Sequence, residues 1–384
     1  MLVGAKIAYA QPTQIVPAQD GIKGAEDKDV EGWAPFLGLT STLSLTDNKS
    51  VVGQVDGFST LFGLGVVGGA DYVKGPHLWR TNLSIAESFA RTPVVDSWIK
   101  QNDALKLDSI YNYVVTKYFG AFGRFSVQTS VFNSDDIRGT PTSWVQKNGD
   151  GTTTPLATMT DHLRTSSAGK PLTLNESIGG FADPYRKPWL NLSIRLGVGE
   201  RSTFADGSYI NADDKSTPEI EMVRLSDVHQ FGIEGFAGGS GKLKDGKASY
   251  LAGFSVMFPV VNNDSANRSA TSLTRLALEA AVTFNIYSWM GLVYNLSVIR
   301  DPQLFPAGQD RVAVQNNLLL TFNFTLVKKP EKPKAPTKEE LELKAANDRA
   351  DAAEKRAAEA ESKLKTEPAP VTPTPEPAPP TPAP

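Results

Sequence analysis

The chain has 384 residues, a formal net charge of −3 and no cysteine. This length fits one large domain with appendages, and the near-neutral charge gives no broad basic field for binding nucleic acid. The absence of cysteine excludes a disulfide framework, a cysteine-ligated zinc site and a thiol nucleophile.

The N-terminus resembles the end of a secretory signal. Ala8-Tyr9-Ala10 before Gln11 fits an A-x-A cleavage site, although only seven residues precede it. We interpret residues 1–10 as a signal-peptide remnant, with a chance pair of alanines as the alternative. Residues 11–31 are polar and contain proline and glycine, which predicts a flexible lead-in.

From residue 32 to residue 328, apolar and polar residues alternate repeatedly. The clearest case ends the region, where Leu318, Leu320, Phe322, Phe324 and Leu326 alternate with mostly polar residues. A transmembrane β-barrel needs this pattern because lipid covers one side of each strand and the lumen lies on the other. The same alternation predicts strands within 37–45, 62–72, 79–85, 105–113, 124–131, 190–198, 231–234, 250–258, 276–286 and 292–298.

The connections between these strands indicate that one strand is missing from the pattern. Single-chain bacterial barrels have an even number of strands, with short turns on one side and long loops on the other. Short turns and long connections alternate correctly except between 202 and 227, so we place the last strand at Glu219 to Leu225. The predicted short turns are 74–76, 116–117 and 285–288, and the long connections are 46–57, 91–103, 133–188, 261–274 and 301–311.

The predicted fold is therefore all-β, a twelve-stranded antiparallel transmembrane β-barrel. Trp79, Tyr118, Phe119, Tyr287 and Trp289 flank the short turns, as expected of rings at a bilayer interface. The alternative is a soluble β-sandwich, in which aromatic residues would more often lie in mid-strand.

The composition changes after the barrel. Residues 329–336 alternate proline with charged residues and predict a stiff linker. Residues 337–365 are rich in alanine, glutamate and lysine, with apolar positions at heptad spacing, which predicts a helix that either forms a coiled coil or stands alone in solvent. Residues 366–384 are rich in proline and predict a disordered, extended tail.

Catalysis and metal binding have little support in the sequence. His77 and His162 occupy a turn and a long loop, whereas His229 shares a strand face with Phe231 and has Ser226 nearby. An outer-membrane lipase using His229 and Ser226 is the alternative to a non-enzymatic protein. Acidic loop residues such as Asp150 and Asp214 are expected to be turn residues. We predict no catalytic residue, no metal ligand and no cofactor.

Polar residues of the strands should point into the lumen. They would either line a hydrated pore or fill a closed lumen with ion pairs, and connection 133–188 could fold inward as a plug. The lumen-lining set is Lys106, Asp108, Asn112, Arg124, Gln128, Asn191, Arg195, Glu234, Glu279 and Asn285.

Three segments resemble an uncharacterised family of bacterial outer-membrane barrels, known mainly from Bacteroidota and described as a domain of unknown function. They are 106–113, 188–197 and 294–301, and Gln315 at the start of the last strand also fits. The resemblance spans about 32–327, and the C-terminal helix is not typical of the family. It implies a barrel and no activity.

The functional expectation is a non-enzymatic protein of the bacterial outer membrane, with its C-terminal tail in the periplasm. It would be either a narrow channel for small solutes or a structural barrel with a periplasmic tether. Its expected partners are membrane lipid, lipopolysaccharide and the barrel-assembly machinery, with peptidoglycan or a second copy for the C-terminal helix, and no nucleic acid.

Overall fold

The computed structural model describes residues 31–48, 57–93, 95–187, 189–214, 216–243, 246–327 and 338–366. The predicted signal remnant, most of the lead-in, the linker and nearly all of the tail lie outside these residues. The chain divides into two compact units, residues 1–331 and residues 332–384. Among the described residues, no helix is both long and apolar enough to cross a membrane.

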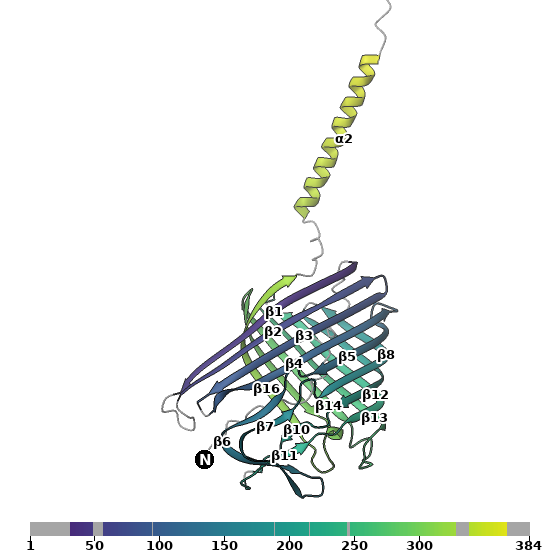
Figure 1. Ribbon diagram of the computed structural model, residues 1–384. Helices are drawn as coiled ribbons and strands as arrows, with labels where there is room; N and C mark the ends of the chain where they lie inside the picture. Colours follow the sequence, from purple (N-terminus) through teal and green to yellow (C-terminus); the bar gives the residue numbers. More distant parts are fainter. Residues whose placement is uncertain are drawn as a thin grey trace, which may run out of the picture. The chain divides into compact units, whose positions relative to one another are not determined.

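Twelve of the described strands close into an antiparallel barrel (Figure 1). Their order around the barrel is β1-β16-β15-β14-β13-β12-β9-β8-β5-β4-β3-β2. Strands that follow each other in sequence are therefore neighbours, except where β6–β7 and β10–β11 interrupt the series. The barrel strands are β1 (Gly32–Asn48), β2 (Gly57–Lys74), β3 (His77–Thr92), β4 (Val95–Val114), β5 (Phe119–Thr129), β8 (Leu172–Lys187), β9 (Leu190–Phe204), β12 (Val228–Leu243), β13 (Ala248–Asn262), β14 (Arg275–Tyr287), β15 (Met290–Arg300) and β16 (Val312–Val327).

The predicted barrel and its number of strands are confirmed, but the position of the twelfth strand is wrong. The segment Glu219 to Leu225 forms β11 (Ile220–Arg224), which lies outside the barrel and is buried on both faces. The missing barrel strand is β8, inside the connection 133–188. Its outward positions include Glu176, Gly180 and Pro184, so the apolar half of the alternation is too weak to recognise.

The connection predicted at 91–103 is also wrong. β3 and β4 continue through this region and pair as far as Thr92 opposite Val95. A shift in register between Ser88 and Phe89 breaks the alternation there, which hides the strand in the sequence.

A second sheet is built from two of the long connections. Its order is β10 (Tyr209–Asn211), β11, β6 (Ser134–Lys147) and β7 (Thr153–Ser166), with β11 parallel to β6. Both connections leave the barrel at the end opposite the short turns, and Figure 1 shows the sheet at that end. Trp144, Ile220 and Met222 form its buried core. We call this sheet, together with the loop 301–311, the cap.

The two faces of the barrel wall differ as a membrane barrel requires. Ile178 and Leu196 point outward and are 66% and 64% exposed, although they are large and apolar. Inward positions of the same strands, such as Ser177 and Arg195, are buried. Outward rings cluster near the short turns, where Trp33 packs on Tyr72 and Trp79, and Trp289 stacks on Tyr287 and Phe322.

The predicted C-terminal helix is present as α2 (Lys338–Thr366). Its described side chains are exposed, including Leu343 of the heptad seam. Whether α2 forms a coiled coil stays a prediction.

Candidate functional site

The candidate site is a cavity of about 720 Å³ inside the barrel. Its walls come from β1 to β5 on one side and β13 to β16 on the other. Its charged side chains come from β3, β4, β5 and β14 and form what we call the charged wall. β1, β2 and β16, which lie between these strands in the order around the barrel, carry hydroxyl groups and glycine. Five of the predicted lumen residues line the cavity: Lys106, Asp108, Arg124, Gln128 and Glu279.

Arg124 is the centre of the charged wall. Its Nε and Nη2 atoms donate to Asp108 Oδ2 at 2.9 and 2.5 Å. Its Nη1 atom lies 3.7 Å from Glu234 Oε1 on β12, a strand separated from β5 by β8 and β9. Ion pairing of this kind offsets the cost of removing both charges from water, so the wall presents compensated rather than bare charge.

Arg195 belongs to a second, tightly filled part of the lumen. Its guanidinium carbon lies 5.9 Å from the ring centre of Phe122 and 5.7 Å from that of Phe236, both within cation–π range. Beside it, Phe122 packs with Ile110 and Phe181 in a buried apolar cluster. None of these side chains lines the cavity, although Ile110 and Phe122 lie on β4 and β5, whose residues Asp108 and Arg124 do.

The remaining predicted lumen residues lie toward the short turns. Asn112 is buried opposite Phe122, and Asn191 pairs with Arg186 and Ser240. Asn285 is exposed at the rim, where its side-chain nitrogen donates to the carbonyl of Gly246 at 2.8 Å. This hydrogen bond joins the end of β14 to the turn between β12 and β13.

At the other end of the barrel, a buried polar network ties the cap to the wall. Arg201 on β9 donates through both terminal nitrogens to the carboxylate of Asp301, and the bond from Nη1 is 3.1 Å long. Arg275 on β14 lies 3.4 Å from the same carboxylate. Gln230 on β12 accepts from Arg201 at 3.4 Å and donates to Gln303 at 2.6 Å. All five residues are almost fully buried.

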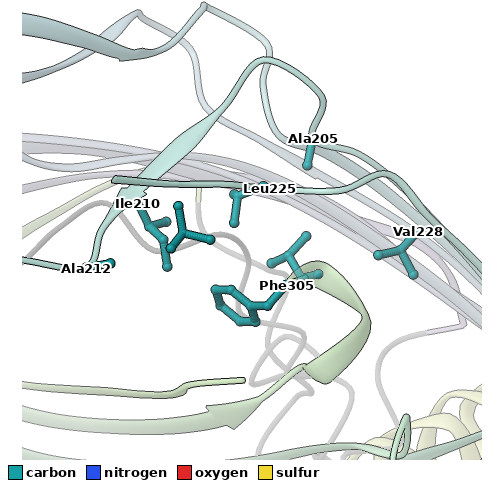
Figure 2. Packing of buried hydrophobic residues seen from close by; sticks show 8 residues of the cluster. Ala205, Ile210, Ala212, Leu225, Val228 and Phe305 are labelled. Atoms are coloured by element: carbon teal, nitrogen blue, oxygen red, sulfur yellow. The ribbon is translucent and has the colours of Figure 1, made fainter. Parts of the chain in front are cut away.

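An apolar cluster joins the second sheet to the same loop. Figure 2 shows Phe305 of the loop 301–311 packed beside Ile210 and Leu225, with Val228 of β12 close by. Because β10 and the β15–β16 loop share this cluster, neither can move without exposing apolar surface to water. The cluster comprises Ala205, Ile210, Ala212, Val223, Leu225, Val228, Leu304 and Phe305.

Arg268 in the β13–β14 loop adds a third connection to the cap. It binds Asp264 at 2.7 Å and Asp310 at 3.1 Å, and it donates to the carbonyl of Phe305 at 3.1 Å. The side-chain hydrogen bonds from Arg268 hold the pKa of the Asp264 carboxyl below its ordinary value. Ion pairs as well as apolar packing therefore hold the loops and the cap together at the long-loop end of the barrel.

Several buried charged residues were not in the predicted lumen set. Arg80, Arg201 and Arg275 all point inward and are almost fully buried. Arg80 is an inward position inside the recognised stretch 79–85 and was left out of the set. Arg201 and Arg275 are in phase with the inward positions of 190–198 and 276–286, so extending the alternation beyond these stretches would have found them. Asp301 follows the end of β15, where no periodic signal remains.

The lipase alternative required His229 to act with Ser226, and the structure gives His229 another partner. His229 points outward, and its Nδ1 atom lies 3.0 Å from Ser202 Oγ on β9. The amide of Ser226 donates to the carbonyl of Leu304 at 3.0 Å, within the cap. Asp227 accepts the amides of Ala205 and Asp206.

The acidic loop residues form turns. Asp150 Oδ1 accepts the amide of Thr152 at 2.9 Å, and Asp214 Oδ1 accepts that of Ser216 at 3.1 Å. Within the described ranges, no three His, Cys, Asp or Glu side chains are grouped so that they could hold a metal ion.

Comparison with known proteins finds only distant likeness. No family model matches the chain, and no curated protein matches it. The translocator domain of the autotransporter NalP from Neisseria meningitidis is 12% identical, with a TM-score of 0.34 over 79% of this chain and 92% of that one. An outer membrane channel from Pseudomonas putida F1 is 9% identical, with a TM-score of 0.36 over 81% and 100%. The NanC porin is 10% identical, with a TM-score of 0.33 over 76% and 100%.

Likeness at this distance assigns neither family nor function. The barrel itself is established by the strand pairing of this chain. Function has to be inferred from its apolar exterior, its charged cavity and its cap.

Proposed function

We propose that the chain is a non-enzymatic outer-membrane β-barrel that passes small solutes through a narrow, capped lumen. The observation that carries the proposal is the cavity of about 720 Å³ with a charged wall, inside a barrel whose outer face is apolar. A purely structural barrel of this size would be expected to fill its interior with side chains, as this chain does around Arg195.

The cap supplies the gate in this proposal. The Arg201–Asp301 pair and the cluster around Phe305 close the long-loop end, so passage requires this end to loosen. Solutes would then meet the wall of Lys106, Arg124 and Glu279, whose mixed charges favour small polar molecules over ions of one sign.

The proposed orientation follows the usual asymmetry of bacterial barrels. In such barrels the long connections lie on the extracellular side of the membrane and the short turns lie on the periplasmic side. Gly32 pairs beside the 75–76 turn and Val327 ends β16 near that same side, so the chain segments beyond both residues would start in the periplasm. Lipid and lipopolysaccharide would surround the barrel, which the barrel-assembly machinery would insert, and α2 would reach peptidoglycan or a second copy.

Conductance in a planar lipid bilayer tests the channel. We expect discrete openings from the purified protein and larger ones after residues 135–165 are replaced by a glycine–serine linker, because this removes most of β6 and β7. Glu279→Gln should change ion selectivity, whereas Leu196→Ala on the outer face should not. Silence of both the intact protein and the variant without β6 and β7, with the barrel shown to be folded, would refute the channel.

The absence of enzymatic activity is tested separately. Within the described chain, the exposed contact between His229 and Ser202 pairs a histidine with a hydroxyl group, as a hydrolase would require. We expect no release of fatty acid from phospholipid vesicles by the intact protein. Release that is lost in both His229→Ala and Ser202→Ala would establish a lipase instead.

A further inference from the structure

The barrel closes through an unusually short ladder. β1 pairs with β16 only from Leu37 to Thr42, although it pairs with β2 along its whole length. β16 in turn pairs with β15 from its first residue. In the described chain, residues 43–48 of β1 and 312–320 of β16 thus keep one neighbour each and do not pair with each other. Figure 1 shows β1 and β2 running on together away from β16.

The interior cavity extends to the place where this ladder stops. Thr42 and Thr321, the last bonded pair, both line it. So does Leu319, which lies on β16 just beyond that pair. On β2, Gly63 and Gly65 lie where an added Cβ would collide with the hydroxyl groups of β1, so no side chain fills this wall.

The outer side of the unpaired stretch is apolar. Leu43 on β1 and Val314 and Leu318 on β16 are exposed, Leu318 to 65%. Hydrocarbon is expected against these side chains, yet unbonded backbone groups of an open edge cost several kcal/mol each in hydrocarbon. The stretch has hydrocarbon outside it and the polar cavity inside it, and it therefore suits an occupant that has both an apolar and a polar part.

We propose that the unpaired stretch between β1 and β16 is a side portal, through which the acyl chain of a single-chain amphiphile passes between the membrane and the cavity. The head group would lie against the charged wall around Arg124 and Lys106, and the chain would extend through the gap. This inference shares with the proposed function only that the barrel spans a membrane, and it does not require passage along the barrel axis.

Fluorescence quenching by lipid tests the portal directly. The chain has no cysteine, so single cysteines can be placed and labelled with bimane. The sites are Thr42→Cys at the portal, Leu196→Cys on the outer face, and Ser177→Cys, which points inward on the far wall. In phosphatidylcholine vesicles with brominated acyl chains, we expect strong quenching at 42 and at 196 and none at 177. A label at 42 as protected as the one at 177 overturns the portal.

Closing the seam provides the second measurement. The test variant combines Leu43→Cys with Leu320→Cys, and its disulfide would continue the ladder by one pair. The control variant combines Leu39→Cys with Phe324→Cys, two positions that are already paired. Binding of nitroxide-labelled stearic acid should be lost when the first pair is oxidised and regained on reduction, whereas the second pair should not affect it. Binding unchanged by the first disulfide overturns the portal, and if that disulfide does not form, the quenching result decides.

The two proposals can fail independently. A barrel that shows no conductance but is quenched at 42 loses its axial channel and keeps the portal. A barrel that conducts but is protected at 42 keeps the channel and loses the portal.

Discussion

At the scale of single residues, Asp301 holds the cap. Its carboxylate is the counter-charge of Arg201 and Arg275, all in a buried network. Removing one partner of such a pair leaves buried charge uncompensated and costs about 3–5 kcal/mol. We expect Asp301→Ala to lower the free energy of unfolding by that amount in urea titrations in detergent micelles, and to increase conductance.

The double variant Arg201→Leu with Asp301→Leu is the matched control for Asp301→Ala. It removes Arg201 together with Asp301, so only Arg275 loses its counter-charge and part of the lost stability should return. Equal stability of Asp301→Ala and the intact protein would show that the pair does not hold the cap.

Asp264 makes one part of the cap sensitive to pH. Its pKa is lowered in the folded protein by the hydrogen bonds from Arg268, so it stabilises the loop at pH values above its ordinary pKa of 3.8. This contribution is lost as the pH falls through the lowered pKa. After correction for intrinsic rates, we expect amide exchange of residues 263–274 to accelerate below about pH 4. Asp264→Asn should exchange fast at neutral pH with little further change, and an identical pH profile in both proteins would contradict this role.

At the scale of elements, close strand contacts depend on particular glycines. Gly179 on β8 faces Gly197 on β9, and an added Cβ would collide with the backbone carbonyl of Leu196. At Gly123 on β5, an added Cβ would have no neighbouring atom within 4 Å. We expect Gly179→Ala to cost about 1–3 kcal/mol by overpacking. Gly123→Ala should stay within about 0.5 kcal/mol of the parent protein. Heat-modifiable migration in gels compares the folded fractions, and equal behaviour of the two variants would refute the close packing.

The elements also show where sequence reasoning works and where it fails. Strong alternation in β9, β14 and β16 predicted membrane strands because every outward position there is apolar for several residues. β8 was missed because glutamate, glycine and proline occupy outward positions. β11 was misassigned because the alternation of short and long connections required a strand between 202 and 227, where this short strand of the second sheet lies.

The sequence predicts those cavity residues that are inward-facing positions of an alternating strand. Asp108, Arg124 and Glu279 follow from alternation alone, and all three line the cavity. The cap network was not predictable, since Asp301 and Gln303 lie in a loop and their partners are distant in sequence. Asp301 meets Arg201, 100 residues away, and Gln303 meets Gln230, 73 residues away. The incomplete pairing of β1 with β16 depends on register, which alternation does not specify.

At the scale of the whole molecule, the outer face of the barrel decides the interpretation. Outward residues of β9, including Leu192, Ile194, Leu196 and Val198, are exposed and apolar, whereas Ser193 and Arg195 between them are buried. A water-soluble protein would rarely expose so many large apolar side chains in one band. The cavity, the cap and the side portal acquire their proposed roles only if hydrocarbon covers this band.

A nitroxide scan of β9 in reconstituted phospholipid vesicles tests this most directly. Single cysteine labels at 192–198 are compared for collision with oxygen, which dissolves in hydrocarbon, and with a water-soluble nickel chelate. We predict that labels at 192, 194, 196 and 198 collide with oxygen and are shielded from nickel, and that labels at 193 and 195, which point into the filled part of the lumen, are shielded from both. Outward labels as accessible to nickel as to oxygen would contradict a membrane-spanning barrel.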